Sequence, residues 1–143
     1  MKVKLESRIV GVVFRRPLIV SSVFRGSLRL DGIIIGISQS SNPLIEAIDM
    51  IMNSKFFDEI SFIVIDAEGF GDVDVDYAFS VSSKPVIVVY GGSMVYRGLS
   101  DSDFKRLMGV AYIRGGFEAL RVSRLIALKL LGTLSNYFPR LME

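Results

Sequence analysis

The sequence predicts a mixed α/β fold, in which a three-stranded antiparallel meander is followed by β-α-β units. Three observations predict it. The first 37 residues hold three short β-branched runs with short connections. Helical apolar spacing begins after residue 42, and two continuous apolar runs of the kind buried on both faces of a sheet then follow. Because half of the 143 residues are hydrophobic, the chain can bury a sizeable core, and we expect one domain over residues 1–143.

The meander is expected in the N-terminal part of the chain. Its strands are Arg8–Phe14, Leu18–Phe24 and Leu28–Ile37, and the pair Arg25-Gly26 forms a turn. The third run contains glycines, which mark bulges or close approaches of another element.

The β-α-β part begins where Pro43 follows a polar cap, with apolar residues at helical spacing up to Met52. A second helix is capped by Asp72 or Asp74, and Ser100 caps a third. The other elements are expected at Ile60–Ile65, Pro85–Tyr90 and Val110–Ile113 for strands, and at Val73–Ser82, Asp101–Met108 and Gly116–Leu134 for helices. A meander followed by a β-α-β-α tail is the ribonuclease-H-like order of elements, and right-handed crossovers make its last strands parallel.

Composition excludes several chemistries. The chain has no histidine and no cysteine, which excludes Ser-His-Asp triads, Cys-His dyads, HExxH zinc sites and disulfides. Any catalysis would use carboxylates, Lys, Arg, Tyr, Ser or a metal held by carboxylates. No apolar run is long enough to span a membrane, and no secretory segment is visible, so we expect a cytoplasmic protein that does not insert into membranes.

Charge is unevenly distributed although the net charge is only +2. Residues 1–35 carry seven basic and two acidic side chains, residues 36–104 carry three and eleven, and residues 105–143 carry seven and two. If the two basic ends meet in space, they form a face that can contact phosphates. The alternative is that these are ordinary solvated positions.

Asp66 is the leading candidate for a functional residue. It ends the apolar run that begins at Ile60, and strand ends line the ligand crevice of open α/β sheets. A carboxylate there can hold a divalent metal, with Glu68 as an assisting ligand; the alternative is a loop or capping carboxylate. Arg121 and Arg124 lie one helical turn apart and can approach a phosphate or remain solvated.

Several stretches, taken in order, resemble the archaeal UPF0215 family, also called domain of unknown function 99. That family is regarded as related to endonuclease V, within the ribonuclease-H-like fold. The matching stretches are Val23–Gly26, Leu30–Gly32, Ser54–Phe56, Val64–Asp66 with Gly69-Phe70, Lys84–Val89 and Glu118–Ala127.

The resemblance implies a Mg²⁺ or Mn²⁺ site, but most of its ligands are missing from this chain. The acidic pair of the family's first strand falls on Val13 and Phe14, and its next acidic motif falls near residues 39–44, where no acid is left. The fourth-strand aspartate is kept as Asp66, and the late histidine position is taken by Arg124. Because magnesium needs carboxylates to stay bound, the resemblance predicts a catalytically degenerate member.

The expected function is therefore nucleic-acid binding on a nuclease-like scaffold without a resident cofactor. The alternative is an active Mg²⁺- or Mn²⁺-dependent endonuclease on deaminated DNA, with Asp66 as the catalytic ligand and Glu68 or Asp31 replacing the missing acids. A third possibility is a protein-interaction subunit, including a homo-oligomer. The side chains expected to contact DNA or RNA phosphates are Arg15, Arg16, Arg25, Arg121 and Arg124.

Overall fold

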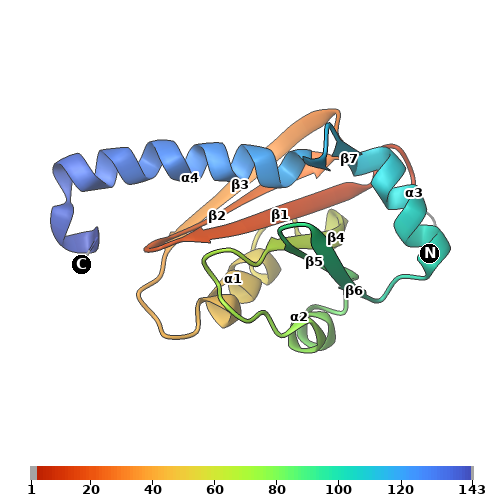
Figure 1. The fold of residues 1–143 in the computed structure, drawn as a ribbon, viewed down its shortest axis with the longest axis horizontal. Coiled ribbons are helices and arrows are strands. Elements are labelled where there is room, and N and C mark those ends of the chain that lie inside the picture. Colours follow the sequence, from red (N-terminus) through yellow and green to blue (C-terminus); the bar gives the residue numbers. More distant parts are fainter. Residues whose placement is uncertain (1–2, 143) are drawn as a thin grey trace.

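A six-stranded mixed sheet forms the centre of the molecule, in a computed structural model that describes residues 3–142 (Figure 1). Its strands are β1 (Arg8–Arg15), β2 (Leu18–Arg25), β3 (Arg29–Ile37), β4 (Ile60–Asp66), β5 (Val86–Tyr90) and β6 (Ser93–Arg97), in the order β3-β2-β1-β4-β5-β6. The pairs β1–β2 and β2–β3 are antiparallel, whereas β1–β4 and β4–β5 are parallel. The predicted meander followed by β-α-β units is thus confirmed.

Helices cover both faces of this sheet. They are α1 (Pro43–Met52), α2 (Val75–Ser82), α3 (Asp101–Ala111) and α4 (Glu118–Tyr137), with 3-10 turns at η1 (Phe57–Glu59) and η2 (Pro139–Met142) and a small hairpin of β7 (Tyr112–Ile113) and β8 (Gly116–Phe117). Figure 1 shows α4 lying along β1 and β2, with α1 and α2 beneath the opposite face. None of the helices described in residues 3–142 has the length and apolar character needed to cross a membrane.

Strand periodicity separates two cores. Along β1, Val10, Val12 and Phe14 pack with α1 and α2, whereas Ile9 and Val13 pack on the side of α3 and α4. The odd-numbered residues of β1 and, from Phe62 onward, the even-numbered residues of β4 therefore face α4. This alternation decides which polar side chains at the strand ends can meet α4.

The α4 helix crosses β1 at very short range. A side chain at Gly11 would place its Cβ 2.7 Å from the backbone of Ala119, so only glycine fits there. Beside this crossing, Ser123 Oγ donates a hydrogen bond to the Gly11 carbonyl at 2.7 Å, and Ser22 Oγ donates to the Ala119 carbonyl at 2.6 Å. These buried polar contacts fix how α4 lies on the sheet, and they therefore also fix the position of Arg124, the next residue of the helix.

Two strands differ from the sequence expectation, and the structure decides between the two predicted caps of α2. The strand β6 was not predicted; it pairs antiparallel with β5 through the Gly91-Gly92 turn, as a short edge strand with alternating exposure. The strand expected at Val110–Ile113 is wrong at its start, because α3 continues to Ala111. The cap of α2 is Asp74, whose carboxylate accepts from the Tyr77 N–H.

Candidate functional site

Asp66 is the last residue of β4, and its side chain lies on the α4 face of the sheet. Only 3% of the residue is exposed. A carboxylate in such a position is costly to bury unless cations or hydrogen-bond donors surround it. The polar contacts of Asp66 therefore define what this strand end can do.

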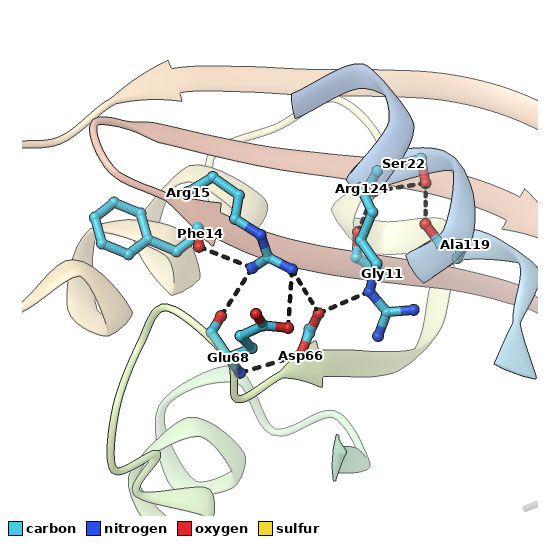
Figure 2. A network of polar contacts seen from close by, with 9 residues as sticks. Gly11, Phe14, Arg15, Ser22, Asp66, Glu68, Ala119 and Arg124 are labelled. Atoms are coloured by element: carbon cyan, nitrogen blue, oxygen red, sulfur yellow. Dashed lines mark hydrogen bonds and ion pairs between the residues drawn. The ribbon is translucent and has the colours of Figure 1, made fainter. Parts of the chain in front are cut away.

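Two arginines hold the same oxygen of Asp66. Arg124 Nε on α4 donates to Asp66 Oδ2 at 2.8 Å, and Arg15 Nη2 at the end of β1 donates to it at 3.2 Å (Figure 2). The other oxygen, Oδ1, accepts the Glu68 backbone N–H at 3.0 Å. The carboxylate thus has three partners drawn from β1, α4 and its own following loop, and all three donate hydrogen bonds.

Arg15 also fastens the loop after β4. Its Nη1 donates to the carbonyls of Phe14 at 3.0 Å and Glu68 at 2.9 Å, while its Nη2 lies 3.5 Å from a Glu68 carboxylate oxygen. Gly69 follows with φ +91°, and a Cβ there would lie 2.0 Å from the Phe14 carbonyl oxygen. The Glu68 side chain is 80% exposed and is the second carboxylate of this cluster.

Val13 lies beside Asp66, on the same face of the sheet. In the parallel ladder Val12 is registered with Ile65, so Val13 and Asp66 follow as the next neighbours. Val13 is fully buried in the α4-side core, and Phe14 is buried on the opposite side. The two positions at which the family resemblance implies acids are therefore apolar and packed.

The charges at this strand end disfavour a divalent cation. At a separation of about 4 Å, an ion of charge +2 is repelled by each guanidinium by about 8 kcal/mol at an effective dielectric constant of 20, which cancels its attraction to one carboxylate. Within residues 3–142 no group of three or more acidic side chains is placed to hold a metal. Asp66 has instead two guanidinium groups as its counter-ions.

Of the remaining predicted residues, Arg16 and Arg121 lie toward the Asp66 end of the sheet and Arg25 does not. Arg16 extends from the β1–β2 turn and donates to the Gln39 carbonyl at 3.3 Å. Arg121 lies one turn before Arg124 on α4 and pairs with Glu118, its Nε donating to Glu118 Oε2 at 2.9 Å. Arg25 lies at the opposite end of the sheet, because it is registered with Arg8, at the start of β1.

Asp31 cannot replace the missing acids beside Asp66, so that part of the nuclease alternative is wrong. It accepts from Arg25 Nε at 2.8 Å and Arg8 Nε at 3.0 Å. Seven residue steps of β1 separate this end from Arg15, roughly 23 Å at strand rise. The hydrogen bond from Arg25 and the nearby positive charge of Arg8 hold the pKa of Asp31 below its usual value.

A pocket that the sequence did not indicate adjoins the Asp66 cluster. It has a volume of about 520 Å³ and lies between the β7–β8 hairpin and the first turns of α4. Its charged lining consists of Arg114, Glu118, Arg121 and Arg124. Arg114 is the residue that sequence reasoning missed; the only local signal was the glycine pair that follows it in Ile113-Arg-Gly-Gly-Phe117, which favours a turn.

The fold and site define an α/β protein with a mixed sheet, whose buried strand-end carboxylate is paired with arginines. No family model matches the chain. The chain is 33% identical over 97 residues to a UPF0215 protein of Methanosarcina barkeri, covering 61% of this chain and 50% of that protein. The predicted resemblance to the UPF0215 family is thereby confirmed, and the chain spans about half the length of the curated relative that it matches.

A solved structure shares the fold. A protein of unknown function from Archaeoglobus fulgidus superposes with a TM-score of 0.71 at 20% identity, covering 86% of this chain and 97% of that one. At this identity the likeness establishes the fold alone.

Proposed function

We propose that the chain is a nucleic-acid-binding protein on an endonuclease V-like, ribonuclease-H-like scaffold that does not cleave phosphodiesters. The scaffold assignment is supported by the strand order, in which an antiparallel meander is joined through β1 to the parallel strands β4 and β5. It is further supported by the resemblance to the UPF0215 family, which is regarded as related to endonuclease V.

The observation that carries the proposal is the pairing of Asp66 with Arg15 and Arg124. Two-metal cleavage needs carboxylates that clamp ions at the attacking and leaving oxygens. In this chain one buried carboxylate faces two guanidinium groups, and Val13 lies in the adjacent position. The arginines thus supply positive charge where a nuclease of this scaffold would carry metal ions.

Nucleic-acid binding is favoured because the arginine side chains at this end keep donors for phosphate. Arg124 uses Nε for Asp66, its side chain is 41% exposed, and its terminal nitrogens point away from the carboxylate in Figure 2. Arg15, Arg16 and Arg121 extend the basic character from the β1–β2 turn and along α4. Arginine forks match the geometry of phosphate oxygens.

Two assays on the full chain test the proposal. Fluorescence anisotropy with a labelled single-stranded oligonucleotide should show an affinity that falls about fifty-fold between 50 and 200 mM salt, as expected for about four phosphate contacts. Arg124→Ala should weaken binding several-fold more than Arg106→Ala, a matched loss of charge from exposed α3. Absent or salt-independent binding would contradict the proposal.

The second assay separates binding from catalysis. DNA containing deoxyinosine or deoxyuridine should stay intact with Mg²⁺ or Mn²⁺, and calorimetric titration with Mn²⁺ should show no saturable binding. Metal-dependent cleavage that disappears in Asp66→Ala would refute the claim of lost catalysis and favour the alternative, an endonuclease with Asp66 and Glu68 as ligands.

A further inference from the structure

The pocket between the β7–β8 hairpin and α4 combines a ligand-sized volume with an excess of positive charge. Its 520 Å³ falls in the range of small-molecule sites. Three arginines and one glutamate line it, which gives a local formal charge of +2. Oxyanions, and phosphate in particular, are the ligands that such an arrangement favours.

Each of the three arginines keeps donors that the protein itself leaves unused. Among the hydrogen bonds of residues 3–142, Arg124 donates only through Nε, and Arg121 donates to Glu118 through Nε and Nη2 but not through Nη1. Arg114 makes no side-chain hydrogen bond or ion pair within the same residues. Carboxylates therefore position the guanidinium groups of Arg121 and Arg124, and all three arginines keep N–H groups that are free to donate to a ligand.

Arg114 occupies an unusual place in the backbone. It is the first residue of the two-residue turn between Ile113 and Gly116, with φ +51°, and Gly115 follows with φ +81°. Such turns favour Asn, Asp or Gly at the first position, because other side chains are strained there. An arginine at this point extends a cationic side chain over the pocket despite that strain.

Glu118 holds Arg121 in place, and the pocket lining keeps a net positive charge. Its side chain is mostly buried, and the hydrogen bond from Arg121 holds the pKa of Glu118 below its usual value, with a further contribution from the charge of Arg114. The glutamate therefore stays ionised and fixes Arg121. Asp66 positions Arg124 by accepting a hydrogen bond from its Nε at 2.8 Å.

We propose that this pocket binds a phosphate group through Arg114, Arg121 and Arg124, and that Asp66 is the positioning residue that orients Arg124 toward it. This inference deepens the proposed function and rests on it for the source of the phosphate, a nucleic-acid strand. It changes the role of Asp66 from metal ligand to support of a phosphate-binding arginine.

Calorimetric titration of the full chain with inorganic phosphate, at constant ionic strength, tests the pocket without nucleic acid. Saturable binding at one site is expected, weakened at least tenfold in Arg114→Ala or Arg121→Ala and less than twofold in Arg106→Ala. Undetectable phosphate binding, or an equal loss in all three variants, would overturn the proposal.

A positioning role for Asp66 and simple electrostatics predict opposite effects of Asp66→Asn on phosphate affinity. Removing a negative charge by Asp66→Asn should strengthen phosphate binding if charge alone acts, whereas a positioning role predicts at least threefold weaker binding. In the Arg124→Ala background, Asp66→Asn should then have no further weakening effect, a result that a general loss of structure would not give. Stronger binding in Asp66→Asn would overturn the positioning role.

Oligonucleotides separate this inference from the proposed function. If an oligonucleotide binds with strong salt dependence but inorganic phosphate does not bind, the pocket is refuted and nucleic-acid binding stands. If phosphate binds but no oligonucleotide does, the proposed function is refuted and the pocket stands. If a 5′-phosphorylated strand binds more tightly than its unphosphorylated control, the ligand of the pocket is a terminal phosphate. If the two strands bind equally tightly and Arg114→Ala weakens both, the ligand is a backbone phosphate.

Discussion

Replacing Asp66 by asparagine tests whether its carboxylate is held by arginines rather than reserved for a metal. The substitution keeps the shape of the side chain but removes its charge. In the unaltered chain Arg15 and Arg124 both donate to Asp66 Oδ2, so the substitution removes the counter-ion that they share. We expect Asp66→Asn to lower the free energy of unfolding.

The size of the loss in unfolding free energy follows from the burial of the Asp66 carboxylate. Breaking a buried ion pair costs about 3–5 kcal/mol, and a hydrogen bond to a charged group contributes about 1.5–3 kcal/mol. The side chains of Arg15 and Arg124 are 23% and 41% exposed, so water screens part of the interaction. We therefore expect a loss of about 2–3 kcal/mol, equivalent to a fall in Tm of about 5–10 °C for a chain of this size.

Urea unfolding monitored by circular dichroism at pH 7 measures this loss. A double-mutant cycle with Arg124→Gln should give a coupling of about 1–2 kcal/mol, because Arg15 still pairs with Asp66 in the single variant. Thermal unfolding with added Mn²⁺ provides the control, since an ion bound at Asp66 would raise Tm of the unaltered chain. An Asp66→Asn variant within 0.5 kcal/mol of the unaltered chain, or a Tm raised by Mn²⁺ only when Asp66 is present, would refute the reasoning.

Three further predictions concern the fold. Gly11→Ala should destabilise the protein by about 2–3 kcal/mol in urea unfolding, because its Cβ would lie 2.7 Å from the backbone of Ala119; a neutral effect would contradict the close packing of α4. Ser21→Ala should be neutral or stabilising by up to about 1 kcal/mol in the same measurement, because its buried hydroxyl has no partner within the described residues, and a clear loss would reveal one. The lowered pKa of Asp31 means that its ion pairs stabilise the protein above the unfolded value of 3.8 and that this stabilisation is lost as pH falls through the lower folded value. The stability difference between the unaltered chain and Asp31→Asn should therefore be largest near pH 6 and shrink below pH 4, and a pH-independent difference would contradict the assignment.

The sequence predicted the central part of the fold because β1, β2 and β4 are buried on both faces. Continuous β-branched runs are typical of such strands. The edge strand β6 escaped prediction for the opposite reason: it has five residues, three of them exposed, and stacks Tyr96 on Phe104 with ring centroids 4.3 Å apart. Because Phe104 belongs to α3, the sequence of Ser93–Arg97 alone does not predict this contact.

The position of the candidate site was predicted from the sequence, but the pairing of its side chains was not. The strand-end rule singled out Asp66, and the family resemblance aligned Arg124 with the family's late histidine. Their pairing was not predicted, because Arg124 lies 58 residues from Asp66 and Arg15 lies 51 residues from it. What joins them is the crossing of α4 over β1 at Gly11, a contact that no local sequence pattern specifies.

The apolar residue at position 13 and the arginines at positions 15 and 124 are physically consistent with one another. A second carboxylate beside Asp66 would add a buried negative charge, which only a metal ion or further cations could balance. With Val13 there instead, two guanidinium groups are enough for the single carboxylate, and the terminal nitrogens of Arg124 stay free to donate elsewhere. Under the proposed function, the strand end where a related nuclease would carry metal ions holds an arginine that we propose binds a phosphate.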